Sequence, residues 1–203
     1  MNTITAPTLP AIGTPMPGGF FAGAYLLNGQ RRALITSPKK LGELNDSVWI
    51  KDYQNVPSAQ SLNDGLANTK AMAEAGSDIA KQALAAVIDG LNDFYIPSQD
   101  ELEIIYRAFK PTTETNSLWG RSGVNASAET PTHPYSEQVP AQTLLDAFKE
   151  GGEEALEAKA YWSSTQHAGS SYNAWSQNFR NGYQDYDNKS VELGVRLVRS
   201  QPI

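Results

Sequence analysis

The chain has 203 residues, of which 40% are hydrophobic, 16 are Lys or Arg and 22 are Asp or Glu, so its formal net charge is −6 at pH 7. This hydrophobic content is enough for a packed core in one large or two small domains. The acidic balance argues against nucleic acid as a partner, because proteins that bind the phosphate backbone usually present a basic face.

The sequence contains no cysteine, so no disulfide stabilises it and thiols do not indicate its compartment. Residues 1–17 have neither the basic start nor the apolar run of a secretory signal. No stretch stays apolar for about 18 residues, as a membrane-spanning helix requires. We therefore expect a soluble protein without a signal peptide or a transmembrane segment.

Prolines are spaced through residues 1–17, which read MNTITAPTLPAIGTPMP. Proline fixes φ and removes a hydrogen-bond donor, so we expect an extended N-terminal arm rather than part of a packed element. Such an arm either grips a neighbouring molecule or is a disordered tail, and the sequence leaves both interpretations open. The globular domain would then comprise residues 18–203.

Two apolar runs between residues 20 and 36 are separated by Asn28 and Gly29. This dipeptide best tolerates the positive φ angles of a tight hairpin turn, so the pattern predicts a β-hairpin. Further along, the apolar residues Val48, Trp49 and Ile50 predict a short strand.

Residues 63–90 are rich in alanine and are interrupted by Gly76 and Ser77. These two residues supply a helix end and a new N-cap, so we expect two helices. A third helix begins at Ser98, because Ser98 and Glu101 fit a capping box. Helical spacing then marks its buried face, which comprises Leu102, Ile105, Tyr106 and Phe109.

Prolines among Ser, Thr, Asn and Gly predict a long loop at residues 110–140. Long structureless loops are uncommon inside compact domains, so this one is either functional or pinned by Trp119. A short helix is expected near residues 141–149.

The segment from Tyr161 to Arg199 crowds Tyr, Trp, Ser and Asn together. Aromatic side chains offer a large rigid contact area, and small polar ones offer adaptable hydrogen bonds, which is the composition of antibody binding loops. The segment therefore predicts a recognition surface, and the protein a binder.

Alternation along the expected strands sorts the positions of this segment. It places Trp175 and Phe179 toward the core, and Trp162 would be a further core anchor. The outward positions would be Ser176, Asn178 and Arg180. In the last strand Val195, Leu197 and, more ambiguously, Leu193 would point inward, with Arg196 opposite.

Three landmarks occur in order, namely DFYIPSQDELE at residues 93–103, YWSSTQ at 161–166 and GVRLVR at 194–199. Together they resemble the DUF1566 family, over about residues 18–199. The resemblance implies a C-type lectin-like fold. This is an α+β domain with an N-terminal β-hairpin, two to four helices and a C-terminal antiparallel sheet that carries a variable region.

Within that family the chain is most similar to phage and prophage proteins whose variable region is rewritten by diversity-generating retroelements. The resemblance implies a virion adhesin, on the phage tail or surface, that binds a bacterial cell-surface receptor, either a protein or a glycan. A single weak patch gains strongly from avidity when several copies bind at once, so we expect a homo-oligomer, with a trimer as one arrangement, in which the arm links copies or contacts other virion proteins. Codons rewritten at adenines can encode the expected ligand contacts, which are His167, Ser171, Tyr172, Asn173, Ser176, Asn178, Arg180, Asn181, Tyr183, Asp185 and Tyr186.

Enzymatic interpretations have less support. Formylglycine-generating enzymes share the broader architecture but are expected to need thiols, and the chain has none. His133 and His167 lack catalytic or zinc partners at a recognised spacing. Glu101 and Glu103 are expected at a helix cap and on a solvated face, which gives a glycosidase little support.

The sugar-binding calcium motifs of C-type lectins are also absent, so we expect neither cofactor nor metal. Asp185 and Asp187 resemble the opening of a calcium loop without its remaining residues, and a structural calcium stays open. The alternative function is a structural virion protein, for capsid decoration or tail assembly, without receptor binding.

Overall fold

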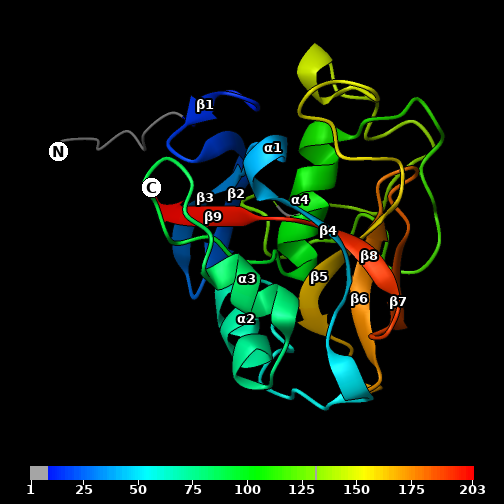
Figure 1. The fold of residues 1–203 in the computed structure, drawn as a ribbon. Helices are drawn as coiled ribbons and strands as arrows, with labels where there is room; N and C mark the ends of the chain where they lie inside the picture. The colour runs from blue at the N-terminus through cyan, green and yellow to red at the C-terminus, as the bar shows by residue number, and fades with distance from the viewer. Residues whose placement is uncertain (1–8, 131) are drawn as a thin grey trace, which may run out of the picture.

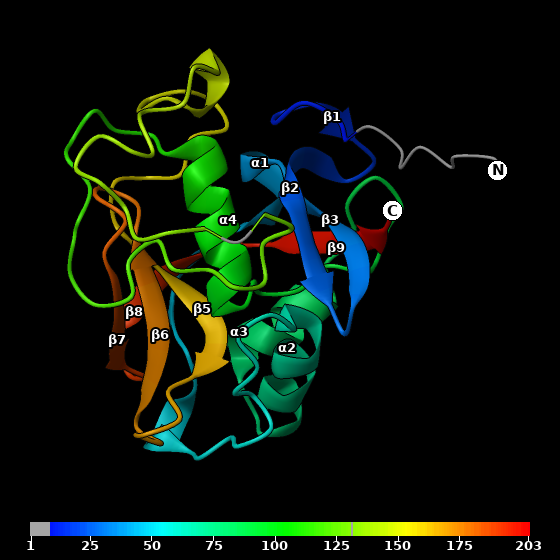
Figure 2. The same ribbon diagram turned by 180° about the vertical axis from the view of Figure 1, so that it is seen from behind.

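Two β-sheets flank one long helix in the computed structural model, which describes residues 9–130 and 132–203. In both views α4 (Gln99–Phe109) stands between the sheets (Figures 1 and 2). The other helices are α1 (Lys39–Gly42), α2 (Gly65–Glu74) and α3 (Asp78–Leu84). The chain is therefore a mixed α+β protein with few helices, as the sequence predicts.

The first sheet has the strand order β1-β2-β3-β9. Its strands are β1 (Pro15–Met16), β2 (Gly19–Leu27), β3 (Gln30–Thr36) and β9 (Val198–Pro202). Strands β2 and β3 form the predicted hairpin, and its turn has φ 52° at Asn28 and 74° at Gly29. These positive angles are those of a type I′ turn, so the hairpin prediction is confirmed.

The described part of the N-terminal arm, residues 9–17, differs from its prediction. Pro15 and Met16 pair with Phe20 and Gly19 of β2, and Leu9 packs against the small buried cluster beneath them. Residues 9–17 thus belong to the packed domain, because their apolar side chains find a partner on β2. Residues 1–8 lie outside the described part of the chain.

The helices follow their predicted local signals. Gly76 separates α2 from α3 with φ 103°, and the Ser77 side chain accepts a hydrogen bond from the amide of Ala80. Ser98 and Glu101 form the predicted capping box at the start of α4. The predicted buried face of α4 is confirmed, since Leu102, Ile105, Tyr106 and Phe109 all belong to the core.

Glu101 is fully buried and saturated with hydrogen bonds. Its Oε1 accepts from the hydroxyls of Tyr25 and Tyr95, both at 2.7 Å. Its Oε2 accepts from the backbone amides of Ser98, at 2.7 Å, and Gly65, at 3.1 Å. One carboxylate therefore joins the first sheet, the start of α2 and the start of α4.

Glu103 was expected on a solvated face of α4, but its side chain is fully buried. The long loop folds over this side of α4 and brings polar partners to the carboxylate. Arg107 lies 2.6 Å from it as an ion pair, and Asn125 and Tyr135 donate hydrogen bonds of 2.9 and 3.1 Å.

The long loop at residues 110–140 contains no regular helix or strand among its described residues, as predicted. The side chains of Asn116 and Asn125 hold this loop. The Asn116 side-chain amide donates to the Pro140 carbonyl at 2.9 Å, and the Asn125 side-chain amide donates to the Asp100 carbonyl at 2.8 Å. Trp119 does not pin the loop, because its side chain is 78% exposed. That part of the prediction is wrong.

The second sheet has the strand order β4-β8-β5-β6-β7. Its strands are β4 (Glu43–Val48), β5 (Ala160–Gln166), β6 (Asn173–Asn178), β7 (Gln184–Asn188) and β8 (Glu192–Arg196). Strand β4 begins earlier than predicted, and the buried Trp49 and Ile50 follow it. The sheet is not wholly antiparallel, because β5 and β8 pair in parallel.

Leu197 separates β8 from β9, and there the chain passes from the second sheet to the first. Val195 and Leu197 are fully buried, as predicted, and Leu193 packs against the same cluster. Arg196 was expected on the opposite side, but it is fully buried too. It can be buried because Glu43, its partner on β4, accepts hydrogen bonds of 2.5 and 3.0 Å.

Two short 3₁₀ helices complete the elements, η1 (Lys51–Tyr53) and η2 (Asp146–Phe148). The second replaces the short helix expected near residues 141–149. Across the described ranges, the chain has no helix with the length and apolar character needed to traverse a bilayer.

The Glu101 network generates a stability prediction. In Glu101→Gln, an NH₂ group would replace one of the two carboxylate oxygens. In either orientation of the side-chain amide, that group would face two hydrogen-bond donors and could accept neither bond. We expect a loss of about 3 kcal/mol in the free energy of unfolding, measured by urea denaturation. Glu192→Gln, at an exposed position of β8, should change stability by less than about 0.5 kcal/mol. An equally small effect for both variants would show that the network contributes little.

Candidate ligand-binding surface

Strands β6 and β7 form a hairpin at one edge of the second sheet, with β7 outermost. The predicted ligand contacts lie on this hairpin, in its turn or in the connection from β5. Figure 1 shows the hairpin at the opposite side of the molecule from the C-terminal end of β9.

Neighbouring segments hold the hairpin largely through its main chain. The carbonyls of Tyr172, Trp175, Arg180 and Asn181 accept hydrogen bonds from Lys189, Ser163, Thr112 and Ser117, respectively. These bonds range from 2.5 to 3.0 Å. Because the contacts use backbone atoms, they do not depend on which side chains these four positions carry.

His167, Trp175 and Tyr186 form a group of three touching rings, here called the aromatic cluster. The ring centroids of His167 and Tyr186 are 4.3 Å apart, and Trp175 lies 5.2 Å from His167. Trp175 and Tyr186 are perpendicular at 5.6 Å, and they are Cα partners across the hairpin. Tyr186 is 45% exposed, so the cluster offers aromatic surface to solvent.

Trp175 was predicted to be a core anchor, and the structure corrects this. Its side chain is half-buried, whereas Ala174 and Ser176 on either side of it are buried. The reason lies on β5, where the indole of Trp162 fills the core directly opposite Ser176. Ser176 shares the face of Trp162, so the neighbouring Trp175 points to the other face. Trp162 and Phe179 are fully buried, as predicted.

Ser176 is the predicted contact that the structure places inside. It is buried, and its Oγ donates a hydrogen bond of 2.6 Å to the carboxylate of Asp187. The expectation that Ser176 faces outward is therefore wrong. Ser171 and Asn173 are half-buried near the start of β6.

Tyr172 is the most accessible of the predicted tyrosines, at 60% exposure. Its ring lies 5.9 Å from that of Tyr53, whose hydroxyl donates to Ser190 at 3.2 Å. Tyr53 belongs to η1, far away in sequence, so the structure adds a ring that sequence reasoning missed.

Lys189 supports this end of the hairpin from inside. It is fully buried, and its ammonium donates to the Gln54 carbonyl at 2.8 Å and to Gln166 Oε1 at 2.6 Å. It also lies 4.4 Å from the centroid of the Trp49 ring. Burial lowers the pKa of Lys189 to about 8. The buried ammonium thus links the turn after β7, which is bonded to Tyr172, to Gln54, the residue next to Tyr53.

The turn of the hairpin uses several predicted contacts for its own geometry. Asn178 Oδ1 accepts from the amide of Arg180 at 2.9 Å, and Asn181 Oδ1 accepts from the amide of Tyr183 at 3.2 Å. The Arg180 guanidinium forms an ion pair of 2.7 Å with Glu114. Asp185 likewise accepts from the amide of Tyr186 at 2.8 Å. Among these residues Arg180, Tyr183 and Tyr186 are exposed.

The structure therefore divides the predicted contacts into two groups. Tyr172, Asn173 and the aromatic cluster lie toward the connection from β5, whereas Arg180, Asn181 and Tyr183 lie at the turn. The two ends of β6 are separated by about 16 Å, given about 3.3 Å per residue. A single small ligand would not span both groups, but a macromolecular surface would.

Sequence reasoning also missed Trp119. It lies on a loop segment that runs beside the hairpin turn, since the Gln184 amide donates to Ser122 Oγ at 3.2 Å and the Ser117 amide to the Asn181 carbonyl at 2.8 Å. The signal for exposure was present, because Trp119 stands in a polar stretch whose only apolar neighbour is Leu118.

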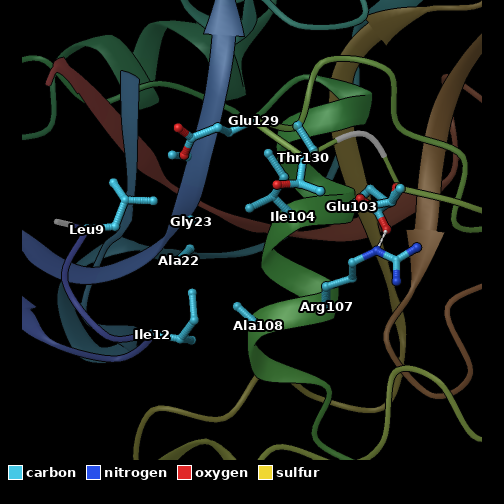
Figure 3. Close-up of a pocket in the computed structure, with 13 residues that line it drawn as sticks. Leu9, Ile12, Ala22, Gly23, Glu103, Ile104, Arg107, Ala108, Glu129 and Thr130 are labelled. Carbon is cyan, nitrogen blue, oxygen red and sulfur yellow. Dashed lines mark ion pairs between the residues drawn. The ribbon is translucent and has the colours of Figure 1, made fainter. Parts of the chain in front are cut away.

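A pocket of about 280 Å³ lies elsewhere, between β2, α4 and the loop residues 128–130 and 132 (Figure 3). Ala22, Gly23, Ile104 and Ala108 give it an apolar floor. Its charged groups are already paired, as the dashed contact between Glu103 and Arg107 in Figure 3 shows. The pocket shares no lining residue with the hairpin, so it is separate from the predicted surface.

Within residues 9–130 and 132–203, no group of three or more His, Cys, Asp or Glu residues is placed to hold a metal ion. His133 is exposed in the long loop. His167 has its ring in the aromatic cluster rather than beside a nucleophile.

Residues 43–199 match the family model described as the Lcl C-terminal domain. The matched range begins with β4 and ends within β9, so it includes α2, α3, α4 and the whole second sheet. No curated protein matches the chain.

Lys189 generates a prediction about pH. Its folded pKa of about 8 lies below the unfolded value of about 10.4, so the unfolded state binds more protons between these values. The destabilising contribution is complete below pH 8 and is relieved as the pH rises. We expect the free energy of unfolding of the wild type to increase from pH 7.5 to 9.5 relative to Lys189→Met, measured by urea denaturation.

Lys70→Met, at an exposed position of α2, is the control and should follow the wild-type curve. If Lys189→Met shows the same pH dependence as both, the buried ammonium is not the group that titrates.

Proposed function

The chain belongs to the Lcl C-terminal domain family, and we propose that it is a non-enzymatic adhesin of a phage or prophage with a C-type lectin-like fold. The β6–β7 hairpin would bind a receptor on a bacterial cell surface. The virion, on its tail or outer surface, would be the place where the protein acts.

One observation carries this proposal, namely that exposed tyrosines stand on a hairpin held by its main chain. Tyr172, Tyr183 and Tyr186 are 60%, 37% and 45% exposed. Tyrosine supplies large, rigid contact area at a low cost in conformational entropy, and it is enriched at the centres of binding interfaces. Exposed aromatic rings on a rigid frame are therefore well suited to recognition.

The frame also supports the proposal of a diversified surface. The backbone bonds of Tyr172 and Arg180 would survive a change of side chain. By contrast, Ser176 and Asn178 use their side chains to hold the hairpin. Diversification would thus be tolerated best at Tyr172, Arg180, Tyr183 and Tyr186, and least at Ser176 and Asn178.

The proposal of a binder rather than an enzyme rests on the state of the acidic residues. The buried carboxylates of Glu101 and Glu103 already accept hydrogen bonds or ion-pair contacts from neighbouring groups. A general acid or base must instead be within reach of the substrate. Binding through a modest patch gains strongly from several copies acting together, so a homo-oligomer, such as a trimer, forms part of the proposal.

The double variant Tyr172→Ala/Tyr186→Ala tests the surface. We expect adsorption of the protein to host cells to fall by about tenfold or more, because two exposed rings leave the contact area. The melting temperature should change by less than about 2 °C, because neither side chain is in the core. Adsorption is measured by the depletion of labelled protein from a cell suspension.

Val87→Ala is the matched control, since Val87 is an exposed apolar residue outside the hairpin. It should leave both adsorption and melting temperature unchanged. Wild-type adsorption by the double variant would reject the proposed surface.

Sequence variation among phage progeny separates the adhesin from an assembly protein. We expect genomes to differ at the codons for Tyr172, Arg180, Tyr183 and Tyr186, whereas those for Trp162 and Phe179 stay fixed because these residues are buried. Deep sequencing of the gene after passage on varied hosts provides the measurement. Uniform sequences at all of these codons would favour the structural alternative.

A further inference from the structure

An exposed apolar group lies beside the turn of the hairpin. Leu118 is 56% exposed and Trp119 is 78% exposed. The neighbouring residues Ser117 and Ser122 are hydrogen-bonded to Asn181 and Gln184, so the loop segment and the turn run side by side. Leu118, Trp119 and Tyr183, together with the carboxylates of Asp185 and Asp187, are called the loop–hairpin patch below.

The charge of this patch is negative and not neutralised. Tyr183, Asp185 and Asp187 alternate along the chain, so their side chains share one face of the outer strand. Within the described residues neither carboxylate forms an ion pair, and both raise the pKa of the Tyr183 hydroxyl. The nearby cations are already engaged, since Arg180 pairs with Glu114 and Arg121 pairs with Asp100.

The outer backbone edge of β7 has its amides already hydrogen-bonded, so a partner would contact this strand mainly through side chains. Asn178 bonds to Tyr183 across the hairpin, so the antiparallel pattern turns the amides of Gln184 and Tyr186 away from β6. Both amides already have acceptors, Ser122 Oγ for Gln184 and Asp185 Oδ1 for Tyr186. A partner strand would have to displace these bonds before it could extend the sheet.

We propose that the loop–hairpin patch binds a basic segment of a partner polypeptide, with a Lys or Arg side chain held between an aromatic ring and the Asp185 and Asp187 carboxylates. A cation is attracted to the face of Trp or Tyr, and a guanidinium also fits a carboxylate in plane. This inference rests on the proposed function and names the chemical class that the same hairpin recognises.

Charge complementarity selects this occupant over the others. A second copy of the chain would bring the same net charge of −6 and the same acidic patch, so the two would repel. Phosphate-bearing or sulfated polymers are disfavoured for the same reason. A basic polypeptide is attracted by the carboxylates and gains apolar contact with Leu118 and Trp119.

The experiment titrates the full chain with fluorescent peptides in which three arginines are spaced by glycine and serine, and follows anisotropy. Matched peptides carry lysine or glutamine in place of arginine. The arginine and lysine peptides should bind about tenfold more tightly than the glutamine peptide, and added salt should weaken their binding. Equal binding of all three peptides overturns the proposal.

Asp185→Asn/Asp187→Asn should weaken binding of the arginine peptide by about tenfold, and Trp119→Ala by severalfold. Asparagine retains an oxygen that can accept the bonds from Tyr186 and Ser176. The control Glu150→Gln/Glu153→Gln changes the net charge equally at exposed positions outside the patch and should bind as the wild type does. An equal loss of peptide affinity in this control would show that the overall charge of the protein causes the effect, and would overturn the proposal.

Adsorption to host cells separates this inference from the proposed function. Parallel losses for Asp185→Asn/Asp187→Asn and for Tyr172→Ala/Tyr186→Ala support both. If only the tyrosine variant loses adsorption, the receptor is bound without a cation and this inference fails while the proposed function stands. If Trp119→Ala changes the sedimentation of the free protein but not peptide binding, a second copy occupies the patch, and the inference fails.

Discussion

The architecture depends on the point at Leu197 where the chain returns from the second sheet to the first. Leu197 donates to the Gly42 carbonyl and accepts from Ser37, which fixes the end of β3 and the start of β4 on either side of it. Next to this point the buried Arg196 binds Glu43, which also accepts from the Tyr161 hydroxyl. A buried guanidinium without its carboxylate costs about 3–5 kcal/mol. The pair therefore fixes β8 against β4 and β5, and through β5 it sets the position of the β6–β7 hairpin.

Features set by neighbouring residues in the sequence could be predicted. The hairpin at Asn28 and Gly29 requires positive φ angles that this dipeptide tolerates. The capping box of Ser98 and Glu101 closes within four residues. The break at Gly76 depends on one flexible residue. The accessibility of Tyr172, Tyr183 and Tyr186 agreed with their polar neighbours, although their role in binding stays a prediction.

Features that depend on a distant partner could not be predicted. A strand pattern has a period of two, but the direction of Trp175 depends on Trp162, which fills the core from the next strand. Glu103 was expected on a solvated face, but the long loop places Asn125 and Tyr135 against its carboxylate. Pinning by Trp119 was one of the two explanations considered for that loop, but the Trp119 side chain is exposed. The loop is instead held by asparagine side chains, whose partners are backbone groups remote in sequence.

The backbone anchoring of the hairpin has a consequence for how this protein can evolve. Its carbonyls at Tyr172, Arg180 and Asn181 are bonded by Lys189, Thr112 and Ser117, and every amino acid has a carbonyl. A mutation at Tyr172 or Arg180 therefore leaves these backbone bonds in place and uses little of the narrow stability margin that limits most proteins. A mutation of Asn181 would also remove the bond that its side chain accepts from the Tyr183 amide. If the hairpin binds a receptor as proposed, new specificities could then accumulate in many orders, since few intermediates would be lost to unfolding.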